Sequence, residues 1–393
     1  MRVLLINVTA DHSSTGNIAF AMQEAVEQNN GEALLCYARG KAQRKKGSYK
    51  FGLDIETYAH GFLTRITGYT DCFSPFSTWR LIRKIKAFAP DIIHIHALHA
   101  YFLQRSMFWK FLQNYPAKIL WSIHCDLDFT GRCGTAQDCI HFKNGCGHCP
   151  HLSLYPKTYF FDHSAHMWKQ KKALYGNLAH MELTTPSKWL AERIGQSFLA
   201  HYPLHIVPNG VFLPINTTKT IQKRYSANLP FVLSVMPKFY DANKGASFVL
   251  ELAKTMPHLQ FIIVSRDHAE EQLAPNVLCL TDVSSTELAS LYADASAFVL
   301  CSKYESFSLT CAEALCNGTQ VVGFCCGAPE TLFMAPYANF VEYGNVQALQ
   351  ATLQNTLENS LPKADVKAYG MANFSLQAMQ QGYLECYNAL LRK

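Results

Sequence analysis

Glu305 and Glu313 are the two residues of this sequence whose types and spacing best fit chemistry on a bound ligand. An acid just before a helix can contact one part of a polar ligand while an acid inside the helix contacts another. The unpaired first-turn amides, here those of Leu309 and Thr310, attract anions. A solvated loop acid plus a solvated helix glutamate is the alternative, but Glu313 has apolar neighbours, and a buried carboxylate needs a partner. Such a site could hold a sugar, a diphosphate and a ribose in a row.

The elements that must position these acids are predicted from the stretch AFVLCSKYESFSLTCAEALCNGTQVVGF. Ala297–Cys301 is an apolar run typical of a buried strand. Ser308 is a suitable N-cap for a short helix over Leu309–Asn317, and Gly318 stands where a left-handed helix stop is needed. Val321–Phe324 predicts a second strand. The loop of this strand–loop–helix–strand unit therefore lies at the carboxyl end of a parallel sheet, where open α/β sheets bind ligands.

The same stretch resembles the signature of glycosyltransferase family 4. The pattern S-x-x-E-x7-E is followed by A-L-x-x-G-T and then V-V. Two positions depart from the family pattern, because Ser308 stands where Gly is usual and Gln320 where Pro is usual. The resemblance implies an α/β fold of the GT-B type, with two Rossmann-like, doubly wound parallel-sheet domains facing across a cleft. It also implies retaining transfer of a hexose from a nucleotide-diphosphate sugar, with a UDP-sugar as the expected donor.

The resemblance also implies roles for individual residues. Glu305 would orient the donor sugar, Glu313 would hold the ribose, and His124, at the end of the predicted strand Lys118–Ile123, would contact the reacting sugar. The expected donor-binding residues are Gly16, Asn209, Lys238, Lys244, Ser308, Leu309, Thr310 and Glu313. Lysines at the carboxyl end of a strand can neutralise a departing diphosphate, so no cofactor is expected to be required for catalysis.

Length and composition set the domain organisation. The chain has 393 residues, of which 49% are hydrophobic and 16% charged, so two well-buried domains are expected. We predict an acceptor-side domain over 1–215, a nucleotide-sugar domain over 216–372, and a last helix in 373–393 that crosses back. The sequence shows neither a membrane-spanning stretch nor a signal-peptide layout, so a cytoplasmic protein is expected.

The first domain is rich in basic residues. Six of the twelve residues from Arg39 to Lys50 are Lys or Arg, and the net charge is +6. Further basic residues alternate with the aromatic residues Phe62, Tyr69, Phe73, Phe76, Trp79 and Phe88. This pattern suits an anionic membrane surface, although a solvated basic face over core aromatics explains it equally. No nucleic-acid-binding module is recognisable, so no nucleic-acid partner is expected. We expect a lipid-linked saccharide acceptor in the synthesis of a surface polysaccharide such as O-antigen, capsule or exopolysaccharide.

The sequence contains 14 cysteines, and five of them lie in an insertion over 125–151 that begins at Cys125. Cys133, Cys139, Cys146 and Cys149 are spaced C-x5-C-x6-C-x2-C, so they are either ligands of a structural zinc or free loop thiols. Disulfides are not expected in a reducing compartment.

Two other functions remain open from the sequence. One is another enzyme of the same fold, such as a nucleotide-sugar epimerase. The other is a non-enzymatic binding protein in which the cysteine-rich segment is the working part. Replacing Glu305 with alanine distinguishes the last function, because it should abolish transfer and leave metal content intact.

Overall fold

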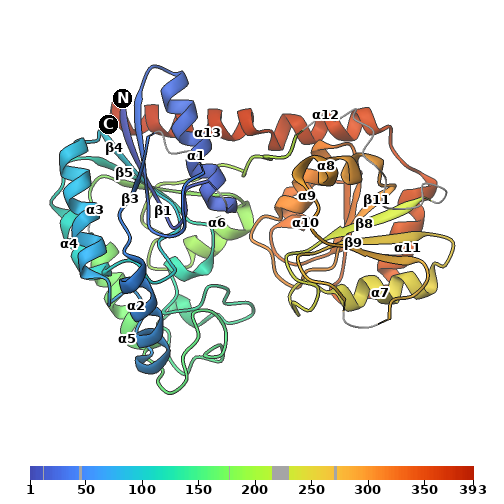
Figure 1. The fold of residues 1–393 in the computed structure, drawn as a ribbon, viewed down its shortest axis with the longest axis horizontal. Helices are drawn as coiled ribbons and strands as arrows, with labels where there is room; N and C mark the ends of the chain where they lie inside the picture. Colours follow the sequence, from blue (N-terminus) through green and yellow to red (C-terminus); the bar gives the residue numbers. More distant parts are fainter. Residues whose placement is uncertain (12, 44–46, 177, 215–229, 270–271) are drawn as a thin grey trace. The chain divides into compact units, whose positions relative to one another are not determined.

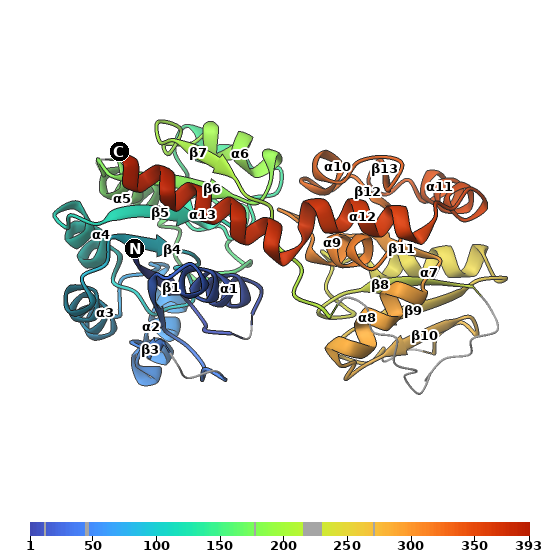
Figure 2. The ribbon, with the colours of Figure 1, turned by 90° about the horizontal axis from the view of Figure 1, so that it is seen from above.

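A computed structural model describes the chain apart from residues 12, 44–46, 177, 215–229 and 270–271. The described residues form two compact units (Figures 1 and 2). Unit 1 comprises Met1–Val207 and Gln380–Lys393, and unit 2 comprises Pro208–Met379. The predicted domain boundary between residues 215 and 216 lies outside the described residues.

Unit 1 is built on a parallel sheet of seven strands in the order β3-β2-β1-β4-β5-β6-β7. The strands are β1 (Arg2–Asn7), β2 (Glu32–Tyr37), β3 (Ser48–Lys50), β4 (Ile92–Ile95), β5 (Lys118–Ser122), β6 (Met181–Thr185) and β7 (Leu204–Ile206). The inner strands read as continuous apolar runs because helices cover both faces of the sheet. The chain moves outward from β1 through β2 and β3, then returns to β4 beside β1, so the strand order reverses between β1 and β4.

Helices pack around the sheet of unit 1. They are α1 (Ser14–Gln28), α2 (Asp54–Thr67), α3 (Pro75–Phe88), α4 (Arg105–Gln113), α5 (Ser164–Tyr175) and α6 (Lys188–Gly195), together with the part of α13 (Leu376–Arg392) from Gln380 onward. The basic run Lys169–Lys172 lies inside α5. Lys171 is buried there and donates hydrogen bonds to the carbonyls of Leu127 and Thr130.

Unit 2 contains a six-stranded parallel sheet in the order β10-β9-β8-β11-β12-β13. Its strands are β8 (Phe231–Val235), β9 (Gln260–Val264), β10 (Val277–Leu280), β11 (Ala297–Leu300), β12 (Val321–Phe324) and β13 (Ala338–Val341). Its helices are α7 (Ala246–Thr255), α8 (Ser285–Asp294), α9 (Leu309–Cys316), α10 (Pro329–Leu332), α11 (Val346–Glu358) and α12 (Lys363–Phe374).

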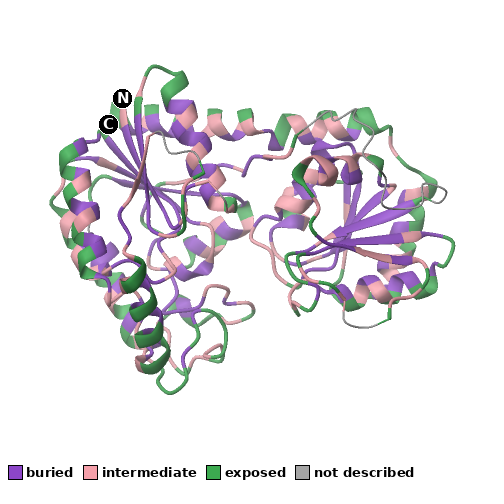
Figure 3. Ribbon diagram, in the orientation of Figure 1, coloured by how far each residue is buried: buried purple, intermediate pink, exposed green. Residues whose placement is uncertain are grey.

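Alternate residues of β11 show why the sheet of unit 2 is buried on both faces. Phe298 and Leu300 join the hydrophobic cluster that includes Leu315 of α9, whereas Val299 joins the cluster that includes Leu349 of α11. The burial colours of Figure 3 show the buried strands between the partly exposed helices. Two doubly wound parallel-sheet units confirm the predicted fold class. Within the described part of the chain, no helix combines the length and the hydropathy needed to cross a membrane.

Candidate functional site

An ion pair marks the point in unit 2 where the strand order reverses. β8 and β11 are neighbours, but the chain continues from β8 to β9 on one side and from β11 to β12 on the other. The loops that follow β8 and β11 therefore diverge at the carboxyl edge of the sheet, where open α/β sheets bind ligands. Lys244 from the first loop contacts Glu305 from the second, with 2.6 Å between Nζ and Oε1. The two side chains are 22% and 16% exposed, so the pair is accessible at the edge of the sheet.

The main chain fixes the position of Glu305. Its N–H donates to the carbonyl of Cys326 at 2.8 Å, and its carbonyl accepts from the N–H of Ala328 at 2.9 Å. The carboxylate of Glu330 accepts hydrogen bonds from the amides of Cys326 and Gly327, both at 3.0 Å. These hydrogen bonds fix the backbone of the loop that carries Glu305, and this backbone places the carboxylate next to Lys244.

Gly245 allows the loop of Lys244 to approach β11. Its φ is +69°, and a Cβ at this position would lie 2.2 Å from the carbonyl oxygen of Cys301. The neighbouring Asn243 accepts from the N–H of Lys303 at 2.8 Å and donates through its side chain to Tyr304 at 3.1 Å. Burial disfavours the charge of Lys244, but the negative charge and hydrogen bond of Glu305 outweigh it and raise the pKa of Lys244. Lys244 is therefore a cation at neutral pH.

The amino-terminal end of α9 lies next in the chain. Ser308 is its N-cap and accepts a hydrogen bond from the N–H of Cys311 at 3.4 Å. Its φ is +72°, the left-handed region that favours glycine, which is the residue usual here in the family that the sequence resembles. The N–H groups of Leu309 and Thr310 belong to the first turn, where a helix supplies no internal acceptor. This end of α9 is therefore suited to an anionic group.

Glu313, inside α9, is held by a tyrosine from the preceding helix. The hydroxyl of Tyr292 in α8 donates to Oε2 of Glu313 at 3.0 Å. Burial raises the pKa of Glu313 to about 7, and the hydrogen bond from Tyr292 lowers it only in part. The carboxyl group is therefore poised to change charge near neutral pH. Sequence reasoning missed Tyr292, because no spacing signal links a buried tyrosine of one helix to an acid of the next.

The other predicted donor-binding residues of unit 2 occupy two different environments. Lys238 is exposed and lies in the same loop as Lys244. Asn209 is buried, and among the described residues its Oδ1 has no hydrogen-bond partner. It precedes Gly210, whose N–H donates to the sulfur of Met379 at 3.1 Å. Asn209 thus offers an unused buried acceptor.

In unit 1, Gly16 lies in the first turn of α1. Its N–H donates to the N-cap Ser13 at 3.1 Å. A Cβ on Gly16 would lie 2.7 Å from Oγ1 of Thr9 and 3.0 Å from the carbonyl oxygen of Ala10. The residue therefore permits close packing of α1 against the loop that leaves β1, at the reversal of strand order in this unit.

His124 follows β5 and belongs to a group of neutral histidines. Its Nε2 lies 3.4 Å from Nδ1 of His96, and the two rings stack. Burial lowers the pKa of His124 to about 4, so the side chain acts through hydrogen bonds rather than as a cation. His94, on the same strand face as His96, is hydrogen-bonded to Tyr387 of α13 at 2.6 Å and to Ser122 at 2.7 Å. These contacts place His94 in the core and leave His124 at the strand end.

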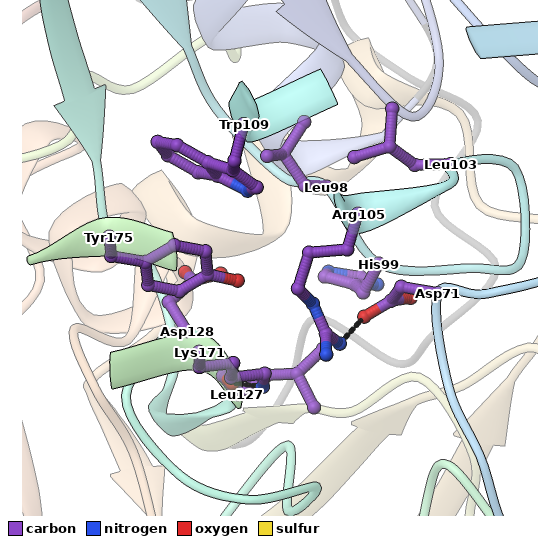
Figure 4. A pocket seen from close by; sticks show the side chains of 10 residues that line it. All are labelled: Asp71, Leu98, His99, Leu103, Arg105, Trp109, Leu127, Asp128, Lys171 and Tyr175. Atoms are coloured by element: carbon purple, nitrogen blue, oxygen red, sulfur yellow. Dashed lines mark hydrogen bonds and ion pairs between the residues drawn. The ribbon is translucent and has the colours of Figure 1, made fainter. Parts of the chain in front are cut away.

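A small polar cavity in unit 1 is lined in part by Leu127 and Asp128, which follow His124 in the chain (Figure 4). Arg105 of α4 forms an ion pair with Asp71 there, and Lys171 of α5 reaches the carbonyls of Leu127 and Thr130. The sequence analysis singled out none of these residues. Lys171 thus ties α5 to the chain just after His124 and is a positioning group for that region, whereas Arg105 ties α4 to the segment that follows α2.

The predicted zinc ligands are only partly assembled. The sulfurs of Cys133 and Cys149 lie 3.6 Å apart, close to the roughly 3.8 Å expected for two thiolates on one tetrahedral zinc. Cys146 instead accepts a hydrogen bond from the N–H of Gly131 at 3.1 Å. Within the described ranges, no three His, Cys, Asp or Glu side chains converge in a geometry that holds a metal ion. Cys133 and Cys149 fit two ligands, and the structure does not present a complete set.

Comparisons with known proteins agree with this geometry. Residues 230–359 match the sequence profile of the family described as "Glycosyl transferases group 1". The chain is 22% identical over 429 positions to the "Putative colanic acid biosynthesis glycosyl transferase WcaC" of Escherichia coli (strain K12), an alignment that covers 99% of this chain and 100% of that protein.

Solved structures show the same fold. Sucrose-phosphate synthase from Thermosynechococcus elongatus matches with a TM-score of 0.67 and 15% identity, covering 100% of this chain and 99% of that one. The HepE protein of Anabaena, solved in complex with UDP-glucose, matches with a TM-score of 0.66 and 14% identity, covering 99% and 100%. Together, the profile, the relative and the fold support a glycosyltransferase with GT-B architecture.

Proposed function

We propose that this glycosyltransferase with the GT-B fold is a retaining enzyme of family 4 that transfers a hexose from a UDP-sugar to an acceptor hydroxyl. The observation that supports the proposal best is the Lys244–Glu305 ion pair where the strand order of unit 2 reverses, followed in the chain by the amino-terminal end of α9. A UDP-sugar is favoured as donor because a protein of the same fold is described in complex with UDP-glucose. Unit 2 is then the donor-binding domain, and unit 1 the acceptor-side domain.

The reaction breaks the bond between the anomeric carbon and the diphosphate, so negative charge develops on the leaving phosphate. Lys244 and the first-turn amides of Leu309 and Thr310 would stabilise that charge, with the exposed Lys238 as a second cation. In the structure the counter-ion of Lys244 is Glu305. We infer that the donor diphosphate replaces Glu305 in this role, which frees the carboxylate to accept hydrogen bonds from the sugar hydroxyls.

The remaining predicted residues hold the parts of the donor that do not react. Glu313, oriented by Tyr292, would accept hydrogen bonds from the ribose hydroxyls. Asn209 has an unused buried oxygen for a donor hydroxyl. Gly16, where α1 packs closely against the loop after β1, would lie beside the donor phosphates. The pKa of His124 is lowered to about 4 by burial, so His124 would contact the reacting sugar as a neutral hydrogen-bonding group.

Calorimetric titration with UDP-glucose, together with donor hydrolysis, tests the donor assignment. We expect Lys244→Met to weaken binding at least roughly tenfold, because one charge-assisted phosphate contact is lost. Lys254→Met, at an exposed lysine of α7, is the matched control and should bind like the wild type. Binding and turnover of UDP-, GDP- and ADP-sugars that are equal in Lys244→Met and the wild type would contradict the proposal. Retention is checked from the anomeric configuration of the product by NMR.

The proposed acceptor is a lipid-linked saccharide in surface polysaccharide synthesis, at the inner face of a membrane. The proposal is supported by the relative whose name refers to colanic acid biosynthesis. A structural zinc on Cys133, Cys139, Cys146 and Cys149 remains a proposal as well. Metal analysis of the purified protein tests it, with a Cys146→Ser, Cys149→Ser variant as the comparison.

A further inference from the structure

The outer face of α2 exposes a stripe of large apolar side chains. Ile55 is 81% exposed, Tyr58 74% and Phe62 62%, and Ile66 continues the row at the carboxyl end of the helix. The spacing of three to four residues places all four on one side of the helix. The opposite side of α2 is buried through residues such as His60 and Thr64. One face of the helix is therefore buried, and the opposite face, which carries the large apolar side chains, is exposed. Figure 3 shows exposed positions along this helix.

A second exposed segment extends this stripe. Tyr159, Phe160 and Phe161 are consecutive and all exposed, Phe160 at 71%. They are anchored to the carboxyl end of α2, because the N–H of Tyr159 donates to the carbonyl of Arg65 at 2.9 Å. With about 200 Å² for a full aromatic side chain, the stripe and this segment expose on the order of 900 Å² of side-chain surface. Monomeric proteins seldom expose an apolar patch larger than a few hundred Å².

The acids around this surface are engaged within the protein. Asp54 forms an ion pair with Lys50 at 2.8 Å. Glu56 accepts from the first-turn amides of α3 at Phe76 and Ser77, at 2.9 and 2.8 Å.

Asp162, beside the aromatic segment, is engaged in the same way. It accepts from the amides of Cys149 and Ser164, at 2.8 and 2.9 Å.

The basic side chains around the surface are instead directed to aromatic rings. The guanidinium of Arg65 lies over Tyr101 at 5.8 Å, and the ammonium of Lys157 lies over Tyr159 at 5.1 Å. On α3, Arg83 lies over Trp79 at 4.7 Å. Both Arg65 and Lys157 are exposed, and neither has a carboxylate partner among the described residues. The rim of the apolar surface therefore keeps its positive charge.

We propose that the α2 stripe and residues 159–161 dock the protein onto an anionic lipid bilayer. Aromatic and branched apolar side chains would enter the boundary between head groups and acyl chains, while Arg65 and Lys157 contact lipid phosphates. The inference rests on the proposed function for its purpose, because a lipid-linked acceptor requires the enzyme at a membrane. The contact itself depends only on lipids. The proposed surface differs from the one that the sequence suggested. Phe88 is a core residue and does not belong to it, whereas residues 159–161, which the sequence analysis did not name, do.

A second copy of this chain is the competing occupant of the surface. The charges favour lipid, because the two copies of a symmetric contact would bring the same unpaired basic residues close together. An anionic bilayer instead neutralises Arg65 and Lys157 without any complementary acid on a partner.

Flotation with lipid vesicles tests the proposal. The wild type should float with phosphatidylcholine vesicles that contain phosphatidylglycerol, and binding should weaken without that lipid or at raised salt. Phe62→Asp combined with Phe160→Asp should weaken vesicle binding by at least roughly tenfold. Two exposed aromatic side chains that would enter the bilayer are replaced by negative charges, which the anionic bilayer repels. Met334→Asp is the matched control in unit 2, because Met334 is 65% exposed, and it should bind like the wild type.

Two further measurements make the result decisive. Circular dichroism and UDP-glucose affinity should be unchanged in the double variant, so a loss of vesicle binding is not a loss of folding. If neither the wild type nor the double variant binds UDP-glucose, but only the wild type binds the vesicles, the proposed donor is wrong and the docking proposal is still supported. Two results would overturn the docking proposal. One is wild-type protein that does not float with the vesicles, and the other is a wild-type dimer that the double substitution converts to a monomer.

Discussion

Replacing Glu313 with glutamine should stabilise the protein and weaken donor binding at the same time. Glutamine keeps an oxygen that can accept from Tyr292 and removes the charge. The pKa of Glu313 is raised from 4.5 to about 7, mainly by burial. At about 1.4 kcal/mol per pKa step, the ionised carboxylate costs the folded state about 3 kcal/mol. At about pH 8.5 the variant should therefore be more stable by up to about 3 kcal/mol, or roughly 6–12 °C in the melting of unit 2.

The sign of the pH dependence follows from a raised pKa. Above pH 7 the folded protein bears the full cost of the charge, and as pH falls from about 7 to 4.5 the folded state takes up a proton that the unfolded state does not. The wild type should thus gain stability relative to Glu313→Gln on acidification, and the two should converge below about pH 4.5. Calorimetric melting at several pH values measures this, with Glu251→Gln, at an exposed glutamate of α7, as control.

Donor affinity provides the second measurement on the same variant. A charged acceptor of ribose hydroxyls contributes about 1.5–3 kcal/mol, so Glu313→Gln should weaken UDP-glucose binding roughly 10- to 100-fold at about pH 8.5. Wild-type affinity should fall as pH drops through 7, and the affinity of the variant should stay flat. A variant as stable as the wild type at every pH, or one that binds the donor equally well, would refute this reasoning.

Three further substitutions test the geometry of unit 2. Glu305→Gln should lower turnover by at least roughly 100-fold with a smaller effect on donor affinity, measured by steady-state kinetics, and equal losses in both would argue against its role with the sugar. Gly245→Ala should cost at least about 2 kcal/mol in chemical unfolding and weaken donor binding through Lys244, because its Cβ would meet the Cys301 carbonyl at 2.2 Å. Ser308→Gly should relieve a left-handed φ and raise unfolding stability by up to about 1 kcal/mol, whereas a loss of stability would show that the hydroxyl cap matters more.

The sequence predicted the elements whose apolar runs have clear polar borders. The strand over Val321–Phe324 has the predicted bounds, and the helix that begins at Leu309 ends within one residue of its predicted end. α2 was missed because its large apolar side chains lie on the outer face and polar residues such as His60 and Thr64 are buried, the reverse of the usual amphipathic pattern. Lys171 belongs to a basic run, but its side chain points inward and donates to a buried carbonyl, which composition cannot reveal.

The sequence predicted which residues belong to the candidate site but not which side chains contact one another there. The motif and its spacing indicated that Glu305 and Glu313 belong to one loop–helix unit. It did not indicate that Lys244 neutralises Glu305, since that contact joins loops 61 residues apart through the neighbouring strands β8 and β11. Nor did it indicate that Tyr292 donates a hydrogen bond to Glu313. Such long-range partners depend on tertiary packing, which a local pattern does not encode.

The two-piece composition of unit 1 has a consequence for how the chain is made. His94 and Ser122 are buried and reach the hydroxyls of Tyr387 and Tyr383, both in the piece after Gln380. On the ribosome, all of Pro208–Met379 must be translated between these partners. Until the segment after Gln380 is synthesised, His94 and Ser122 in the sheet of unit 1 lack their tyrosine hydrogen-bond partners. Its completion is a late event in biogenesis, and the nascent amino-terminal half needs protection from aggregation in the meantime.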